Sequence, residues 1–426
     1  MIFPFEIMLV WLFVVGTCIG SFLNVCIYRL PIGETVVFGG SHCRKCNVSL
    51  RWYDNIPIFG WLRLRGRCRG CGEKFSVRYL LVELFTGIAF SALYWWEIGQ
   101  NGLYPPGMLP PAPGGPPLWL VQHGQYASHV VLLCFMIVAS VIDLDSYQIH
   151  DEVTVTGTLL GLIGAAAFPW SMLPNWSRLN NLNAPVYDSF LPLSNLQVLY
   201  PRWLENWPED GGLYTALACY LFWWVGVTPW PVGNSLARKW RVVWTWHFRK
   251  HRALLHTLIG VVGSLAIVLA WSYLPMPQWK GLMTSLAGAA WGLGLVWLFR
   301  VVASKCLGKE ALGFGDAMLM AMVGAFLGWQ SVLLAFFLFA PIMGLVVAMI
   351  KWLSAGGEHI PYGPYLCLGT AAVVVAWQPI WDYCFMTFFL LGWMLPALIL
   401  ASTGLMAIML LTWVFVKYMA RKQHAA

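Results

Sequence analysis

Two aspartates beside apolar runs are the residues of this sequence best placed to do chemistry. Asp316 ends the motif GFGD, which follows a basic, polar segment and opens into the apolar run 317–330. Asp143 stands at the end of a second apolar run. A carboxylate is expensive inside a bilayer, so an acid at such a junction is a candidate functional residue. The glycines of the motif, Gly313 and Gly315, permit a tight turn and the close approach of another segment.

If the two aspartates share one site, the arrangement is that of an aspartyl protease. Two carboxylates a few ångströms apart cannot both ionise cheaply, so one of them keeps a proton. The ionised member then activates a water molecule, and the protonated member polarises the scissile carbonyl of a peptide. A site at the edge of the membrane suits a substrate whose own apolar helix lies in the bilayer.

Two other interpretations of these aspartates stay open. They can form an ion or proton path, which is a common role of intramembrane acids in transporters. They can also be helix-terminal acids that never meet, with Asp316 serving as a helix N-cap. The second interpretation suits Asp143 poorly, because it closes its apolar run and a helix C-terminus disfavours negative charge.

Four cysteines form a second chemical pattern. They make two CxxC pairs with 21 residues between them, namely Cys43 with Cys46 and Cys68 with Cys71. This spacing lies just beyond the usual range for zinc sites, and each pair can present two thiolates to one tetrahedral metal. The surrounding segment is predicted to be cytoplasmic, where structural disulfides are rare. We therefore expect a structural zinc site, since four cysteines leave no open coordination position.

The composition excludes an ordinary soluble protein. Of the 426 residues, 59% are hydrophobic and 10% are charged, and the mean hydropathy is +0.67. Soluble domains carry about 25% charged residues. Between residues 23 and 80, ten Lys and Arg face only three acids, which places this segment in the cytoplasm by the positive-inside rule. A nucleic-acid surface is the alternative explanation, but topology accounts for the charges, and we expect no nucleic-acid partner.

The apolar runs predict an all-α polytopic membrane protein with about eleven transmembrane helices. The N-terminus is expected outside and the C-terminus inside, because every Lys and Arg cluster then falls on one side. Both aspartates lie on that cytoplasmic side. The expected spans are 7–25, 79–96, 130–142, 153–170, 213–230, 254–274, 282–303, 317–330, 331–350, the run that ends at 377, and 384–416.

Five ordered blocks of the sequence resemble the type IV prepilin peptidases, which belong to the GxGD class of membrane aspartyl proteases. The matching stretches are GSFLNVCIYRLP (20–31) with the CxxC pairs, RYLLVELFTG (78–87), the segment 143–151, GKEALGFGD (308–316) with GAFLGWQ (324–330), and PYGPYLCLG (361–369). The sequence departs from the family at His150, where proline is usual. It departs again at Ala317 and Met318, where a branched residue and a lysine are usual, and at Leu80, where proline is common.

The resemblance implies a division of the chain. It places an N-terminal prepilin peptidase domain at 8–97, with the four-cysteine module at 26–78, and a Pro-rich outer loop at 98–128. An aspartyl peptidase membrane domain follows at 129–378, interrupted at 171–283 by an insertion with two extra spans. A hydrophobic extension covers 379–426.

The resemblance also implies a function. It gives catalytic roles to Asp143 and Asp316, supporting roles to Gly313 and Gly315, and zinc binding to the four cysteines. The implied reaction removes a short basic leader from type IV prepilins or pseudopilins at the cytoplasmic face of the bacterial inner membrane, for pilus assembly or type II secretion. Bifunctional members also methylate the new N-terminal amine with S-adenosylmethionine, although the sequence shows no separate site for this methyl donor.

Two hypotheses compete with the peptidase. The first is an ion-coupled transporter that uses the intramembrane acids. The second is a non-enzymatic assembly platform of a secretion machine, in which the zinc module serves as a docking surface.

Overall fold

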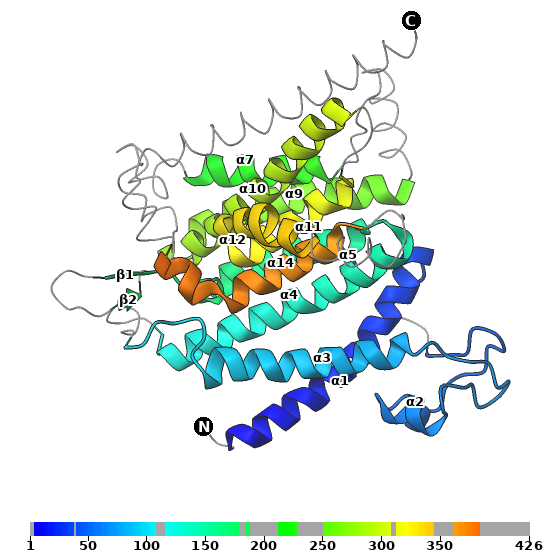
Figure 1. Cartoon of the computed structure of the whole chain (residues 1–426). Coiled ribbons are helices and arrows are strands. Elements are labelled where there is room, and N and C mark those ends of the chain that lie inside the picture. The colour runs from blue at the N-terminus through cyan, green and yellow to red at the C-terminus, as the bar shows by residue number, and fades with distance from the viewer. Residues whose placement is uncertain are drawn as a thin grey trace, which may run out of the picture.

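Helices make up almost all of the structure, a computed structural model that describes residues 4–37, 40–107, 116–178, 185–187, 212–227, 250–307, 312–344 and 361–383 (Figure 1). The helices of the first half are α1 (Phe5–Arg29), α2 (Phe59–Arg63), α3 (Arg78–Tyr94), α4 (Leu118–Ser146) and α5 (Asp151–Ala167). Those of the second half are α7 (Gly212–Gly226), α9 (Lys250–Tyr273), α10 (Met276–Leu307), α11 (Phe314–Leu327), α12 (Trp329–Leu334) and α14 (Gly363–Val375).

Shorter elements join these helices. Turns of 3-10 helix cover Leu30–Ile32, Trp52–Asp54 and Pro169–Ser171, and π-helical turns cover Trp95–Gly99 and Ala335–Phe339. The strands β1 (Trp176–Arg178) and β2 (Pro185–Tyr187) form one antiparallel hairpin, with Trp176 opposite Tyr187. The all-α class is confirmed, because this hairpin of three-residue strands is the sole sheet among the described residues.

The backbones of α1 and α3 lie in direct contact with each other. A Cβ added to Gly16 would lie 2.8 Å from the Cα of Gly87, and one added to Gly20 would lie 2.8 Å from the Cα of Glu83. Small residues at helix contacts are typical of membrane proteins, where they let two backbones approach closely. The four-cysteine module follows α1 and precedes α3, so this tight pair forms its two-helix base (Figure 1).

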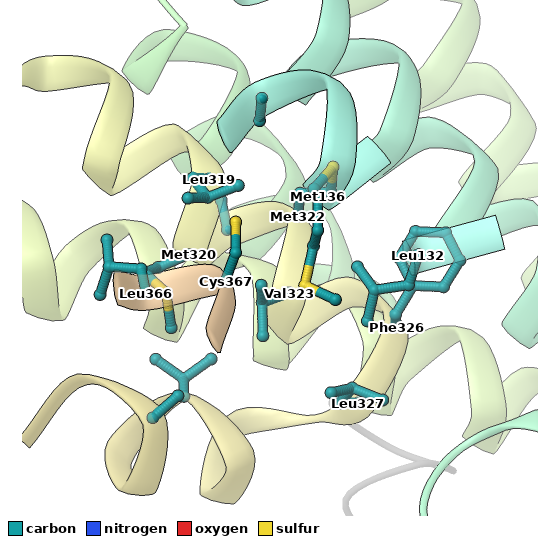
Figure 2. Packing of buried hydrophobic residues seen from close by; sticks show 14 of the residues in the cluster. Leu132, Met136, Leu319, Met320, Met322, Val323, Phe326, Leu327, Leu366 and Cys367 are labelled. Atoms are coloured by element: carbon teal, nitrogen blue, oxygen red, sulfur yellow. The ribbon is translucent and has the colours of Figure 1, made fainter. Parts of the chain in front are cut away.

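α11 is the most enclosed helix among those described. Its residues from Ala317 to Val323 have 0% exposed surface. Figure 2 shows its Met320, Met322 and Phe326 among side chains of α4 and α14. On the other side, α10 approaches so closely that a Cβ on Gly292 would lie 2.2 Å from the carbonyl oxygen of Met320. α11 is therefore held by protein on all sides, which fixes the position of the GFGD turn at its N-terminus.

The described residues hold fewer helices of membrane-spanning length than the eleven expected for the whole chain. Five of the described helices are long and apolar enough to cross a membrane, or six if the bent pair Gly363–Val375 and Trp377–Tyr383 is counted as one span. These five are Phe5–Ile32, Arg78–Gly99, Leu118–Ser146, Leu254–Tyr273 and Met276–Lys305. A multi-pass helical protein is confirmed, but the count of eleven is not, and the expected span 384–416 lies outside the described residues.

The difference has a physical reason. Several expected spans form shorter helices, such as α7 with 15 residues and α11 with 14, whereas a helix needs about 20 residues to cross a bilayer. Hydropathy does not separate a helix that faces lipid from one enclosed by protein. α9 illustrates the first kind, with Leu254, Leu258 and Val261 more than half exposed, and α11 illustrates the second.

Candidate functional site

Asp143 lies in the last turn of α4 and is 5% exposed. Its Oδ2 accepts a hydrogen bond from the backbone N–H of Gly363 at 3.0 Å. Gly363 is the first residue of α14, so the carboxylate sits at a helix N-terminus, where the helix dipole favours negative charge. This second helix offsets the unfavourable dipole of α4, which sequence reasoning had left without compensation.

Only glycine allows this approach of the α14 backbone. A Cβ added to Gly363 would lie 2.6 Å from Oδ2 of Asp143, well inside van der Waals contact. The two residues are 220 positions apart in the chain. The PYGPYLCLG block (361–369) therefore contributes a backbone donor to the site, a role that its sequence alone did not suggest.

Asp316 is held in a similar way at the start of α11. It occupies the third helical position, and its Oδ2 accepts the N–H of Gly313, the N-cap residue, at 3.1 Å. The N-cap is therefore Gly313 and not Asp316, which corrects the alternative interpretation of the motif. Asp316 is 6% exposed, so both aspartates are buried and each Oδ2 accepts a backbone N–H from a glycine.

The structure brings the two aspartates together around one residue of the α4–α5 hairpin. A Cβ on Gly315 would lie 2.8 Å from Cβ of Ile149, and one on Gly363 would lie 3.0 Å from Cδ1 of the same residue. Ile149 is thus clamped between the N-termini of α11 and α14. Asp143 and Asp316 lie within electrostatic range of each other, and both act on the thiol of Cys367 in α14.

Arg300 is a site residue that sequence reasoning missed. It is 3% exposed in α10, and its Nε donates to the carbonyl oxygen of Leu312 at 3.1 Å. Its guanidinium carbon lies 5.7 Å from the ring centroid of Phe314, and its charge acts on Asp316. The available signal was a single arginine near the end of the expected span 282–303, a position that the positive-inside rule also explains.

The hairpin after Asp143 is closed by local hydrogen bonds. Tyr147 adopts a left-handed conformation (φ 55°), and its N–H donates to the carbonyl oxygen of Asp143 at 2.9 Å. The hydroxyl of Ser146 donates to the carbonyl oxygen of Ile142 at 2.8 Å. His150, which replaces the usual proline, has φ −83° and ψ 137°, an extended conformation close to the one that proline favours.

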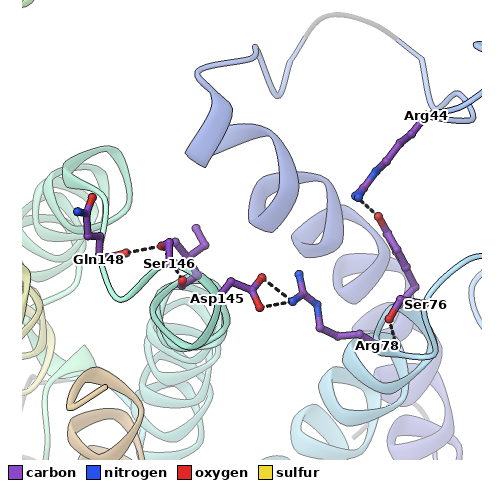
Figure 3. A network of polar contacts seen from close by, with 8 residues as sticks. Arg44, Ser76, Arg78, Asp145, Ser146 and Gln148 are labelled. Atoms are coloured by element: carbon purple, nitrogen blue, oxygen red, sulfur yellow. Dashed lines mark hydrogen bonds and ion pairs between the residues drawn. The ribbon is translucent and has the colours of Figure 1, made fainter. Parts of the chain in front are cut away.

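An ion pair joins this hairpin to the N-terminal part of the chain. Arg78, the first residue of α3, binds the carboxylate of Asp145, two residues beyond Asp143 (Figure 3). Both side chains are nearly half exposed. Exposed pairs of this kind contribute about 0–1 kcal/mol, so the pair serves as a contact point more than as a source of stability.

The four cysteines meet in one cluster, as the sequence predicted. All four sulfurs lie within 4.8 Å of one another. Cys43 and Cys71 are 3.8 Å apart between sulfurs, and so are Cys46 and Cys68. A tetrahedron of sulfurs about 2.3 Å from a central zinc has edges of about 3.8 Å. The donor set and its spacing therefore fit a tetrahedral metal.

The two CxxC pairs have matching backbones. The N–H of Cys43 donates to the carbonyl oxygen of Val48 at 3.0 Å, and the N–H of Cys68 donates to that of Glu73 at 2.7 Å. Asn47 and Gly72, each four residues after the first cysteine of its pair, both have positive φ. Backbone N–H groups of Cys46 and Lys45 lower the pKa of the Cys43 thiol to about 6, which favours its thiolate form.

Comparisons with known proteins match two parts of the chain. Residues 14–97 match the family model of the bacterial peptidase A24 N-terminal domain, and residues 250–349 match that of the type IV leader peptidase family. The first part contains the four-cysteine cluster, and the second contains the GFGD motif. The second match begins within 171–283, the segment predicted to be an insertion, so the domain boundaries stay predictions.

Several characterised proteins are similar to the chain. A prepilin leader peptidase/N-methyltransferase of Myxococcus xanthus is 40% identical over 166 residues, which are 38% of this chain and 41% of that protein. A prepilin leader peptidase/N-methyltransferase of Pectobacterium carotovorum is 28% identical over 381 residues, which are 84% of this chain and 88% of that protein. A protein of Escherichia coli named "Type 4 prepilin-like proteins leader peptide-processing enzyme" is 37% identical over 172 residues, which are 36% of this chain and 55% of that protein.

The matches differ in how much of each relative they cover. The chain aligns with less than two thirds of the Myxococcus and Escherichia proteins but with most of the Pectobacterium protein. No solved structure matches.

Proposed function

The chain belongs to the type IV leader peptidase family, and from this premise we propose that it is a membrane-embedded aspartyl endopeptidase that removes leader peptides from type IV prepilins or pseudopilins. One observation carries the proposal. Two buried aspartates from distant helices, Asp143 and Asp316, lie within electrostatic range of each other, and each is held by a glycine N–H. None of the relatives described above is a transporter.

The proposed reaction uses the aspartates as one unit that shares a proton. The ionised carboxylate takes a proton from water while the water oxygen attacks the scissile carbonyl carbon. The protonated carboxyl gives its proton to the carbonyl oxygen, so no free oxyanion forms. The tetrahedral intermediate then collapses and the C–N bond breaks. The leaving amine takes up the proton that the first carboxylate had accepted, and one hydroxyl of the intermediate returns its proton to the second carboxylate, which restores the starting state of the pair. Gly363 and Gly313 keep both carboxyl groups in place through these steps.

We place the site at the cytoplasmic face of a bacterial inner membrane. The basic segment around the four-cysteine module favours this orientation, and the Arg78–Asp145 pair puts that segment beside the hairpin of Asp143. A short basic leader would therefore meet the acids from the same side as the module. The four cysteines would hold a structural zinc that ties the two CxxC segments together.

A second activity, methylation of the new N-terminus, is part of the proposal. S-adenosylmethionine would supply a methyl group bound to a positively charged sulfur. The neutral amine would accept this methyl group on its nitrogen as the C–S bond breaks, with the bond electrons going to sulfur and one ammonium proton going to water. The amine that the peptidase releases is the one to be methylated, so the two reactions follow in order.

Cleavage by matched variants tests the peptidase. The full chain in lipid nanodiscs is given a prepilin with a basic leader, and the product mass is measured for wild type, Asp143→Asn and Asp316→Asn. Asp145→Asn is the matched control, because it changes an acid of the same hairpin that forms only an exposed pair. We expect Asp143→Asn and Asp316→Asn to lose cleavage. The control Asp145→Asn should keep a cleavage rate within a few-fold of wild type. Equal cleavage by all four proteins would refute the aspartyl mechanism.

A further inference from the structure

The four-cysteine module exposes an apolar stretch that lies outside both sites described above. Trp52 is 80% exposed, Phe59 is 73% exposed and Leu62 is 52% exposed. Phe59 and Leu62 stand three residues apart in α2, so they share one face of that helix. Figure 1 shows α2 at the edge of the molecule, away from α4 and α5. Large apolar side chains that gather on a surface mark an interaction site, and we call residues 51–63 the α2 segment.

Two arginines accompany these apolar side chains. The guanidinium carbon of Arg51 lies 5.8 Å from the ring centroid of Tyr53, and that of Arg63 lies 5.4 Å from it. The ring of Trp52 meets the same tyrosine edge-on, with 5.6 Å between the ring centroids. The α2 segment therefore joins positive charge to apolar surface in one place.

The acids of the module pair with other cations. Residues 23–80 contain three acids, and the pairs are Glu34 with Arg29, Asp54 with Arg69, and Glu73 with Lys45. Neither Arg51 nor Arg63 forms an ion pair with any of the described residues. Both side chains are exposed, so an anionic partner can reach them.

A hydrogen bond sets the depth of α2 relative to the membrane. The N–H of Ile58, the residue before α2, donates to Oε2 of Glu83 at 2.8 Å. Glu83 follows the first residue of α3 by five positions, and α3 belongs to the candidate membrane span Arg78–Gly99. At 1.5 Å per residue, Glu83 lies about 7.5 Å from the start of that span. The headgroup layer of one leaflet is about 5–7 Å thick, so α2 begins near the boundary between headgroups and acyl chains.

We propose that the α2 segment docks the four-cysteine module on the cytoplasmic leaflet of the membrane by binding anionic phospholipids. Trp52, Phe59 and Leu62 enter the boundary between headgroups and acyl chains, where aromatic and apolar side chains of interfacial segments collect. Arg51 and Arg63 bind the headgroup phosphates, which match the planar donor geometry of a guanidinium. The proposal concerns a lipid partner and does not depend on the peptidase reaction.

The chemistry of the surface favours lipid over other partners. The leader in the proposed reaction is basic, so the arginines would repel it. A nucleic acid would pair with the arginines but would leave the apolar side chains in water. An anionic lipid surface satisfies both kinds of group at once. Docking also holds the module at the level of Arg78, whose ion pair with Asp145 contacts the hairpin that carries Asp143.

Photocrosslinking tests which partner covers the α2 segment. The photoreactive amino acid p-benzoylphenylalanine is placed at position 59 of the full chain in native membranes, and the tryptic peptide that contains it is weighed after irradiation. We expect this peptide to gain the mass of a phospholipid. Val48 is the matched control position, because it is an apolar module residue that is 54% exposed and lies outside the α2 segment. Attachment of position 59 to a protein, no attachment, or equal lipid attachment at both positions would overturn the proposal.

Lipid charge tests the role of the arginines. The full chain is placed in nanodiscs of phosphatidylcholine, with or without phosphatidylglycerol, and hydrogen exchange is measured for the amides of the α2 segment. We expect anionic lipid to slow this exchange. Each arginine near an anionic surface contributes about a fivefold preference for docking, so Arg51→Gln together with Arg63→Gln should reduce the effect by up to about 25-fold. Equal exchange of the wild type in both lipids would overturn the proposal.

A second double variant separates the α2 segment from the general charge of the module. Arg67→Gln together with Lys74→Gln removes the same charge from two residues that lie opposite each other in the second CxxC turn. This variant should keep the effect of anionic lipid, and a loss equal to that of the first double variant would contradict docking through the α2 segment. Unchanged exchange in the two CxxC turns reports that the module stays folded in each protein.

Discussion

Replacing Gly363 by alanine tests whether the close approach of α14 positions Asp143. The new Cβ would lie 2.6 Å from Oδ2, and ordinary contact begins at 3.4 Å. The carboxylate and the α14 backbone must therefore separate by about 0.8 Å, which also stretches the 3.0 Å hydrogen bond from the Gly363 N–H. A displacement of about 1 Å in a catalytic group can lower the rate about 100-fold.

We expect Gly363→Ala to lower kcat by about 30- to 100-fold, equivalent to about 2–3 kcal/mol of transition-state stabilisation. KM should change little, because the substitution faces the carboxylate and not a substrate contact. The assay is cleavage of a prepilin by the full chain in nanodiscs, over a range of substrate concentrations. Gly164→Ala in α5 is the matched control, since a Cβ there meets nothing within 4 Å.

Two results would refute this reasoning. If Gly363→Ala cleaved within about threefold of wild type, the short contact with Oδ2 would not matter for catalysis, since a factor of three is only about 0.6 kcal/mol. If KM rose while kcat stayed constant, Gly363 would contact the substrate and not position the acid. A lower rate in Gly164→Ala as well would show that any added methyl group disturbs the protein.

Further predictions concern the supports of the two sites. Arg300→Met should leave the carbonyl of Leu312 without its donor, cost about 1–3 kcal/mol locally, and speed hydrogen exchange at 312–316; unchanged exchange and cleavage would contradict a positioning role. Removal of zinc with a chelator, or Cys68→Ser, should expose residues 40–77 to trypsin while the helices stay protected, and equal protection with and without metal would argue against a structural zinc. Arg78→Glu and Asp145→Arg should each weaken the contact between α3 and the hairpin by up to about 1 kcal/mol. The double variant should restore that contact at low salt, and a double variant no better than the singles would rule out the ion pair.

The sequence predicted the parts of the site that depend on local patterns. Each CxxC turn is a short local structure, so the four-cysteine cluster could be expected from spacing and thiol chemistry alone. The GFGD turn at the start of a helix was also visible, because glycines and an acid interrupt an apolar run. Asp143 stood out for the same reason. In all these cases the residues that define the feature are neighbours in the chain.

The parts that sequence reasoning missed depend on distant contacts. Gly363 meets Asp143 across 220 residues, and no local pattern announces a backbone donor. The helix of Asp143 begins at Leu118, because Gln125 and His129, which lower the hydropathy of its first half, are buried among protein groups. The count of eleven spans is not confirmed for a related reason, since α11 is as apolar as a lipid-facing helix but is enclosed by other helices.

Both aspartates depend on main-chain donors, and this has a consequence for how the protein can change. Replacing a neighbouring side chain does not remove the N–H of Gly313 or Gly363 itself, although contacts such as the one from Arg300 to the Leu312 carbonyl still position that backbone. A change of identity at a neighbouring side chain such as Tyr362 therefore leaves the donor groups of both acids in the chain. The donors that hold both acids therefore do not depend on which side chains line the site.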